Sequence, residues 1–405
     1  MVRIALISDI HFGRFSRTDE FSVPGERIKD ENQGAKSLKE SLIDVLKEKK
    51  VQYIFVAGDL TSVGSPQEFF FCEKEILSIA QGVGVPKDNI ILGLGNHDID
   101  WQITKIFDDY TKSSEKDFPF ELVKNTYQLM GAYAPTYSMN EIHQPDKKGP
   151  APFSGIVEND DFVVFILNSG WCCTHDQKIS HGKLTVEQLE WFQKKAEDYR
   201  KVNKWKIVLM HHHPFNYSYH IPSFDISMME ESGKFIDIAG QNGINMVLHG
   251  HRHHPKAETS FKNGWVNPIT FVCAGSLAVN SVHRSNGDIP NTFHIMELSH
   301  EPGILTLHNF QYSPAQGWIP IKNNCAETPL DSEMMLGKIY DSDVINKSIF
   351  KLATVEKELL WRDLDDCLRF LTVDDLNKRV KTLLVDTHKM IGHFPDEVVL
   401  VKKGG

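Results

Sequence analysis

The chain has 405 residues, a formal net charge of −10, 41% hydrophobic residues and 24% charged residues, which is typical of a soluble globular protein with room for more than one domain. The acidic balance disfavours extensive binding to a nucleic acid backbone, and no segment reaches the roughly 18 consecutive apolar residues of a transmembrane helix. The short N-terminal apolar run does not fit a signal peptide, and the six cysteines form no Cys-x-x-Cys pair, so we expect reduced thiols in a cytoplasmic protein without membrane contact.

Apolar runs alternate with amphipathic segments along the first 300 residues. Residues 37–50 place Leu38, Leu42, Val45 and Leu46 on one helical face, and Thr185 with Gln188 gives a capping-box signature for another helix. Eight apolar runs predict strands, at residues 3–9, 52–59, 89–98, 162–169, 204–212, 244–251, 292–298 and 304–310. Strands that alternate with helices predict an α/β fold.

The pattern changes near residue 321. Residues 321–405 carry apolar side chains at helical spacing, for example Leu360, Leu364 and Leu368, and predict a small, mostly helical C-terminal appendage. A region of this kind can pack on its own chain, bind a protein partner or mediate oligomerisation. Residues 101–152 are interpreted as an insertion with helical and loop character that can overhang a pocket. We therefore expect one domain over residues 1–320 and a C-terminal region over residues 321–405.

Potential metal ligands follow five of the predicted strands. The strand ends read Asp9-x-His11, Gly58-Asp59, Gly95-Asn96-His97-Asp98, His211-His212-His213-Pro214 and Gly250-His251-x-His253. Ligands of open α/β sheets bind at the carboxyl ends of strands, so these side chains are expected to converge. The glycines before Asp59, Asn96 and His251 permit tight turns and close approach of the backbone.

The donor types indicate the kind of metal site. Two carboxylates, one amide and four imidazoles are too many for one tetrahedral ion and fit two ions that share a carboxylate. Without thiolates, manganese or iron is expected, and zinc is an alternative. Two metals about 3.5–4 Å apart can clamp the attacking and leaving oxygens of an in-line phosphoryl displacement, with a deprotonated bridging water as nucleophile.

These five blocks, in this order, resemble those of the calcineurin-like metallophosphoesterases. The resemblance implies a two-layer β sandwich flanked by helices, with a dimetal centre at the strand ends. It assigns Asp9, His11 and His253 to one metal and Asn96, His212 and His251 to the other, with Asp59 as the bridge. It also implies that His97 contacts the phosphate or protonates the leaving group, with Asp98 as its partner.

The run His211-His212-His213 offers three candidates for one metal ligand. The family usually places this ligand two residues before the proline, which selects His212. Strand alternation sends His211 and His213 to the other side, from where His213 can still reach a substrate.

The second block, "GDLTSVG", together with "LMHHHPF" and "GKLTVEQLEWF", looks like that of bacterial class III cyclic-nucleotide phosphodiesterases. This resemblance predicts hydrolysis of a cyclic nucleotide or similar small phosphodiester, with phosphomonoesters as a further substrate class. Two alternatives remain: a metal-dependent DNA nuclease acting with a partner, since the repair-nuclease branch shares "SDIHFG", and a regulatory subunit with a structural dimetal site. The Ser/Thr protein phosphatase branch is disfavoured because Thr61 follows Leu60 and Asp98 follows His97.

Overall fold

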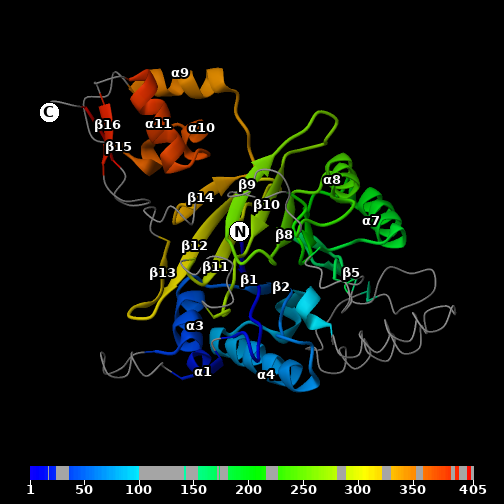
Figure 1. Cartoon of the computed structure of the whole chain (residues 1–405). Helices are drawn as coiled ribbons and strands as arrows, with labels where there is room; N and C mark the ends of the chain where they lie inside the picture. The colour runs from blue at the N-terminus through cyan, green and yellow to red at the C-terminus, as the bar shows by residue number, and fades with distance from the viewer. Residues whose placement is uncertain are drawn as a thin grey trace.

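The computed structural model describes most of the chain, with gaps (Figure 1). The described residues are 1–16, 18–23, 36–99, 141–142, 154–170, 173, 181–215, 227–280, 289–321, 330–352, 359–384, 388–391 and 399–402. The predicted insertion at residues 101–152 therefore lies outside the described residues, apart from the backbone of the short strand β4.

Two mixed sheets form the centre of the molecule. Within the described residues, the first is seven-stranded and runs β13-β12-β11-β1-β2-β3, with β14 paired to β12. Its strands are β1 (Val2–Ile7), β2 (Tyr53–Ala57), β3 (Ile90–Gly93), β11 (Thr292–Leu298), β12 (Leu305–Ser313), β13 (Gly317–Pro320) and β14 (Glu333–Leu336). Strands β1, β2 and β3 are parallel, so their carboxyl ends lie at one edge.

The second sheet, also seven-stranded within the described residues, runs β4-β5-β6-β7-β8-β10-β9. Its strands are β4 (Glu141–Ile142), β5 (Gly155–Glu158), β6 (Phe162–Ile166), β7 (Trp205–Leu209), β8 (Met246–His249), β9 (Lys256–Ser260) and β10 (Ile269–Cys273). Strands β6, β7, β8 and β10 are parallel. The predicted strands are thus present, and the sequence pattern missed short or half-exposed ones such as β9, whose residues are all partly buried.

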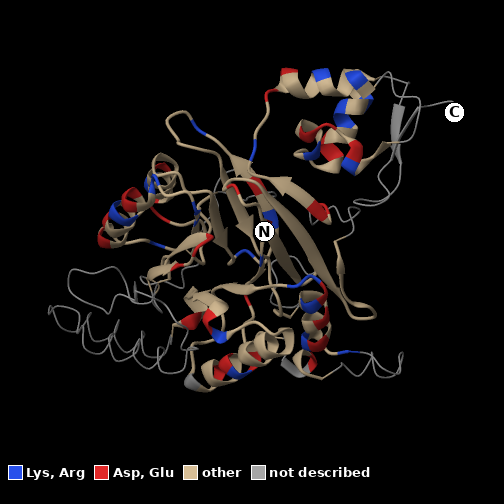
Figure 2. Cartoon of the chain, turned by 180° about the vertical axis from the view of Figure 1, so that it is seen from behind, with Lys and Arg blue, Asp and Glu red and all other residues tan. Residues whose placement is uncertain are grey.

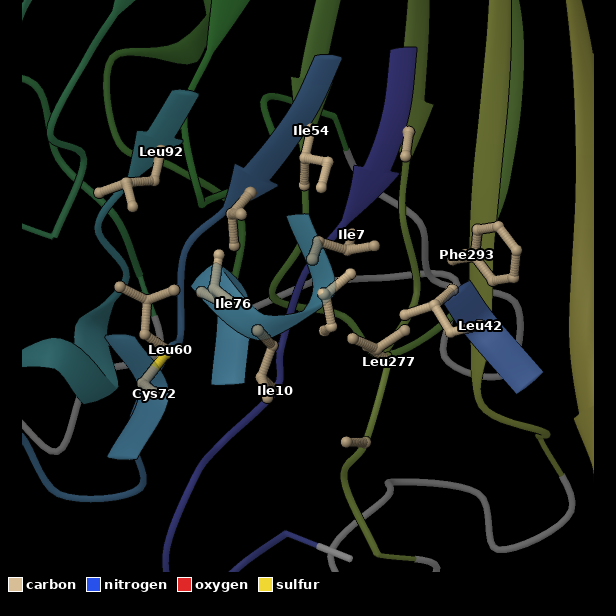
Figure 3. Close-up of a cluster of buried hydrophobic side chains, with 14 of the residues drawn as sticks. Ile7, Ile10, Leu42, Ile54, Leu60, Cys72, Ile76, Leu92, Leu277 and Phe293 are labelled. Carbon is tan, nitrogen blue, oxygen red and sulfur yellow. The ribbon is translucent and has the colours of Figure 1, made fainter. Parts of the chain in front are cut away.

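Helices cover the outer face of each sheet, which gives four layers. Helices α3 (Leu38–Glu48) and α4 (Pro66–Val83) pack on the first sheet, beside α1 (Thr18–Phe21), and Figure 3 shows Leu42 of α3 beside Phe293 of the sheet. Helices α7 (Val186–Tyr199) and α8 (Ser232–Gln241) pack on the second sheet. A separate apolar core lies between the sheets. The expected two-layer β sandwich flanked by helices is confirmed, and each fully buried Leu or Ile side chain stabilises it by about 1.5–3 kcal/mol.

Capping residues mark the ends of several helices. The Ser37 and Ser65 hydroxyls accept hydrogen bonds from Glu40 and Glu68 at the starts of α3 and α4, and Gly84 ends α4 in a left-handed conformation. The capping box predicted at Thr185 is only half formed. Thr185 caps Gln188, but the buried Gln188 side chain donates to the carbonyl oxygen of Asn168 instead of returning to the helix start.

The C-terminal region forms a further unit with its own apolar core, drawn in orange and red in Figure 1. It contains α9 (Ser342–Leu352), α10 (Asp366–Arg369), α11 (Val373–Leu383) and a sheet of β15 (Leu359–Leu360), β17 (Val399–Lys402) and β16 (His388–Ile391). The region is therefore helical as predicted but also carries strands. Strand β14 and Leu330 belong to the sandwich, so the sandwich continues past residue 320.

None of the helices in the described ranges combines the length and apolar content that crossing a membrane requires.

Candidate dimetal centre

The candidate site lies where strand ends of both sheets meet. Asp9, Asp59 and Asn96 follow β1, β2 and β3 of the first sheet, and His211 and His251 follow β7 and β8 of the second. Backbone bonds tie these ends together: Asp9 N donates to the Gly58 carbonyl oxygen at 3.0 Å, and Gly250 N donates to that of His211 at 3.0 Å. Segments far apart in the sequence thus build one polar cluster, as the strand-end argument predicts.

The first group of potential ligands contains Asp9, His11, Asp59 and His253, whose donor atoms lie within 4.8 Å of one another. Nε2 of His253 is 3.1 Å from Oδ1 of Asp9, and Nε2 of His11 is 3.3 Å from Oδ2 of Asp59. Both carboxylates are fully buried or nearly so. The spacing Asp9-x-His11 therefore does place both side chains on one side.

The second group contains Asp59, His211 and His251 within the same limit of 4.8 Å. Nε2 of His211 lies 3.1 Å from Oδ2 of Asp59, and its Nδ1 lies 2.7 Å from the carbonyl oxygen of Ala57. Asp59 belongs to both groups, which is the position expected of a shared carboxylate. Asn96 is buried at the adjoining strand end, next to His97, whose N–H donates to Oδ1 of Asp59 at 2.8 Å.

His212, which the family spacing selects, lies differently. Its Nδ1 contacts the Ser169 hydroxyl at 2.9 Å, its ring centroid is 4.4 Å from that of His251, and Gly182 packs closely against it. Strand alternation put His211 on the far side from the site, but the β7 ladder ends at Leu209, so alternation does not control the residues that follow. His213 is buried beside His251, with ring centroids 5.9 Å apart.

The backbone at the site is strained in a consistent way. Seven described residues other than glycine have a positive φ, and five of them are predicted ligands: Asp9, His11, Asp59, His251 and His253. This conformation costs about 1–2 kcal/mol per residue with a side chain. Backbone strain that is concentrated on the predicted ligands is typical of functional sites, where the surrounding fold holds the side chains in place.

Two glycines allow the carboxylates to approach the backbone. A Cβ on Gly95 would lie 2.1 Å from Oδ1 of Asp59, and a Cβ on Gly250 would lie 2.4 Å from Oδ2 of Asp9. The close approach expected from the glycines at these positions is therefore present.

Electrostatic interactions between carboxylates and histidines shift the pKa values of several residues in the two ligand groups. Burial opposes the charged forms, yet the neighbouring histidines hold the pKa values of Asp9 and Asp59 well below their usual range. Against the same burial, the carboxylates raise the pKa of His11 to about 10 and that of His211 to about 9. Burial lowers the pKa values of His212 and His251 well below the usual range.

His97 is held by Ser62. Its Nδ1 lies 2.8 Å from the Ser62 carbonyl oxygen, which can only accept, so Nδ1 carries the proton. Burial lowers the pKa of His97 to about 4. The sequence pattern missed Ser62, although it lies in the "GDLTS" block. The Ser62 hydroxyl also donates to the carbonyl oxygen of the predicted ligand His11 at 2.6 Å.

Asp98 does not bond the His97 ring. Its carboxylate accepts from the N–H groups of Thr61 and Gly95, both at 2.9 Å, and so joins the two loops that carry Asp59 and Asn96. Burial raises the pKa of Asp98 to about 6. The residue predicted as partner of His97 thus positions the backbone of the site.

The donor set fits metal ions. In the described part of the chain, the buried polar atoms without a hydrogen-bond partner include Nε2 of His251, a member of the second donor group. A buried polar atom left in this state costs about 1–3 kcal/mol, and a bound cation removes that cost for an imidazole nitrogen. Carboxylates and imidazoles without thiolates suit manganese, iron or zinc.

Comparisons with known proteins identify the family. Among solved structures, the chain is similar to purple acid phosphatase PPD1 of yellow lupin, with 15% identity and a TM-score of 0.48, over 78% of this chain and 52% of that one, about half its length. It is also similar to a dimetal phosphatase of Danio rerio, with 10% identity and a TM-score of 0.43, over 78% of this chain and 98% of that one. A third is Vps29 of Chaetomium thermophilum, with 10% identity and a TM-score of 0.33, over 84% of this chain and 100% of that one. No curated protein sequence matches the chain. The family model of the calcineurin-like phosphoesterases matches residues 2–255, more than half of the chain, and the protein belongs to that family.

Proposed function

We propose that the protein is a dimetal-dependent phosphodiesterase. The observation that carries the proposal is the shared position of Asp59, which belongs both to the group with Asp9, His11 and His253 and to the group with His211 and His251. Two donor groups joined by one carboxylate fit a pair of divalent ions better than a single structural ion.

The proposed ligands divide between the two groups. Asp9, His11 and His253 hold one ion, Asn96, His211 and His251 hold the other, and Asp59 is shared. His211 replaces His212 in this assignment because its Nε2 lies 3.1 Å from Asp59 and its Nδ1 is fixed by Ala57. When bound, the ions supply Lewis acidity towards the phosphoryl group and lower the pKa of water, and manganese or iron is our first expectation.

His97 orients and protonates the substrate in this proposal. The Ser62 carbonyl fixes Nδ1, so Nε2 is the ring nitrogen that meets the phosphoester. An anionic phosphate beside a buried imidazole favours its protonated form, and Nε2–H can then donate to the leaving oxygen. Asp98 supports this geometry through Thr61 and Gly95 and makes no contact with the reacting atoms.

A small phosphodiester, such as a cyclic nucleotide, is the proposed substrate class. Figure 2 shows Lys and Arg interspersed with Asp and Glu along the helices, in keeping with the acidic net charge of −10 rather than with a broad basic face for duplex DNA. The described cysteines are free and buried, which supports a reducing compartment such as the cytoplasm. The C-terminal unit of α9–α11 is the proposed place for a protein partner.

The test compares bis-p-nitrophenyl phosphate with p-nitrophenyl phosphate. Chelator-treated protein receives manganese, iron, zinc, nickel or magnesium, and the variant Asp59→Asn is measured beside it. We expect diester turnover that returns with manganese or iron and that falls by about a hundredfold to a thousandfold in the variant, the scale of losing one principal electrostatic group. Lys194→Gln, an exposed change on α7, is the control and should behave as wild type.

Three results would redirect the proposal. Turnover at the wild-type rate in Asp59→Asn would show that the shared carboxylate is not required for hydrolysis. Degradation of DNA at rates above those for small diesters would favour a nuclease. Two bound ions without turnover of any ester would favour a regulatory subunit with a structural metal centre.

A further inference from the structure

A half-buried aromatic side chain lines the candidate site on the His97 side. The Phe15 ring centroid lies 6.0 Å from that of His97, with the planes at 90°, and 6.4 Å from that of His11. Both imidazoles belong to the proposed machinery. If His97 protonates the leaving oxygen, the organic group attached to that oxygen lies next to Phe15.

The loop that carries Phe15 is fixed on several sides. Phe15 N donates to the Ser62 hydroxyl at 3.1 Å, and Asn280 N donates to the Phe15 carbonyl oxygen at 2.9 Å. Ser16 pairs with Val279 in an isolated bridge. The same Ser62 holds His97 and His11, so Phe15 and the site are built on one framework and little entropy is lost when Phe15 packs on a ligand.

Arg14, the residue before Phe15, adds a positive charge next to this aromatic ring. It is exposed, and its guanidinium carbon lies 5.6 Å from the Phe15 ring centroid, in cation–π contact. Within the described ranges, no carboxylate lies at ion-pair distance from Arg14. A guanidinium that is held on an aromatic ring and makes no ion pair can bind an anion through its forked N–H donors.

We propose that Arg14 and Phe15 form a recognition element for a second anionic group on the substrate, beyond the scissile phosphorus. Phe15 packs on the organic group next to the leaving oxygen, and Arg14 binds the phosphate or carboxylate that follows it. The inference rests on the proposed function and narrows its substrate class to phosphodiesters with a further anion about one sugar away, such as a nucleotide with a second phosphate or a short oligonucleotide.

A matched pair of substrates tests this directly. The methyl phosphodiester of thymidine 5′-phosphate is compared with the same compound carrying a 3′-phosphate, and release of the nucleoside by cleavage of the P–O5′ bond is followed by chromatography, so that the scissile bond is constant and the second anion lies on the leaving group. We expect wild-type kcat/KM to favour the 3′-phosphorylated compound about tenfold, mainly through KM, the scale of one charge-assisted hydrogen-bonded contact. Arg14→Gln should bring this ratio close to one, and Arg14→Lys should keep part of it because the charge remains without the fork. Lys194→Gln removes an equally exposed charge from α7 and should keep the full ratio.

Binding measured by calorimetry separates this inference from the proposed function. Thymidine 3′,5′-bisphosphate should bind the wild type about tenfold more tightly than thymidine 5′-monophosphate, and Arg14→Gln should remove the difference. Phe15→Leu should weaken the binding of both ligands and reduce the difference in affinity, because Arg14 loses its aromatic support.

Equal affinities in the wild type, or a preference that survives Arg14→Gln, would overturn the recognition element even if diesters are hydrolysed. The expected preference in a protein that turns over no ester would keep the element and overturn the phosphodiesterase. A carboxylate at the 3′ position that matches the phosphate would show that any anion suffices.

Discussion

Nε2 of His211 lies 3.1 Å from Oδ2 of Asp59, and the opposite ring nitrogen of His211 is held 2.7 Å from the carbonyl oxygen of Ala57. Ala57 and Asp59 belong to one strand end, so that strand end fixes both nitrogens of the ring. A histidine whose far nitrogen is fixed by a backbone carbonyl presents the other nitrogen in a defined direction, as metal ligands require. His212 instead turns its Nδ1 to Ser169.

His211→Ala should therefore remove one of the two metal ions, whereas His212→Ala should keep both. The affected ion is the one held with His251 and Asp59. Losing a partner in the outer shell of a metal already costs about tenfold to a hundredfold in affinity, so the loss of a direct ligand should cost at least as much. Metal content after dialysis, measured by mass spectrometry per mole of folded protein, checks this expectation.

His300→Ala is the control for that experiment, because His300 is exposed and its ring forms a hydrogen bond with the N-terminal amine, away from the candidate site. It should keep two ions. Two ions in His211→Ala and one in His212→Ala would restore the assignment by the spacing to Pro214.

Gly95→Ala should disrupt the site although the change is only one methyl group. The new Cβ would lie 2.1 Å from Oδ1 and 2.6 Å from N of Asp59, so the carboxylate has to move. We expect loss of metal binding and a destabilisation of about 1–3 kcal/mol, typical of overpacking. Gly233→Ala in α8 meets no atom within 4 Å and should raise the free energy of unfolding by about 0.4–1 kcal/mol. Chemical denaturation of both variants, with metal content, decides between these outcomes.

The sequence predicts much of the candidate site because the proposed ligands occupy strand ends. Buried strands are visible as apolar runs, so Asp9, Asp59, Asn96 and His251 can be located by the point at which each run stops. His211 could not be selected in this way. Its orientation depends on where the β7 ladder ends and on a carbonyl from β2, which are tertiary facts.

Strands without a clear apolar run, and side-chain contacts, were predicted less well. Strand β9 is partly buried along its whole length, so it lacks the apolar run that identifies a strand. The family resemblance implied that Asp98 is a partner of His97, yet its carboxylate accepts hydrogen bonds from the backbone of Thr61 and Gly95. Short-range adjacency says little about side-chain contacts in a 3₁₀ turn such as that of residues Asn96–Asp98.

Metal binding should strengthen as the pH rises from about 6.5 to about 9. In the metal-free protein the carboxylates raise the pKa of His11 to about 10 and that of His211 to about 9, so both rings hold protons that a metal has to displace. These raised values stabilise the metal-free fold below the unfolded pKa near 6.5, and that stability is lost as the pH passes 9–10.

The stabilisation by metal, measured as the difference in melting temperature with and without a chelator, should therefore grow across this pH range. It should follow the metal affinity obtained by competition with a chelating dye at each pH. A difference in melting temperature that is constant between pH 6.5 and 9 would contradict the proton displacement. The variant His211→Ala should show a weaker dependence on pH, since it lacks one of the two displaced protons.

Asp331 joins the sandwich to the C-terminal unit and gives a separate pH dependence. Its Oδ2 accepts from the Val373 N–H at the start of α11, at 2.9 Å, and its carbonyl oxygen accepts from the buried Asn309 side chain at 2.6 Å. Burial raises the pKa of Asp331 to about 6, and the nearby Asp374 and Asp375 act in the same direction. The folded state thus holds this proton more tightly than the unfolded state, whose pKa is near 3.8, so the contribution of Asp331 to stability falls as the pH rises from about 4 to about 6.

Asp331→Asn should remove this loss, because the amide oxygen can still accept from Val373 and carries no charge. We expect the variant to be more stable than the wild type by up to about 3 kcal/mol at pH 7.5, with the difference shrinking to near zero at pH 4. Urea unfolding of metal-free protein at both values measures the difference, and groups of the dimetal site cancel because they are common to both proteins. Asp341→Asn, an exposed change ahead of α9, should show no such trend. A variant that is less stable than the wild type at pH 7.5 would mean that the ionised carboxylate strengthens the bond to α11 by more than its burial costs.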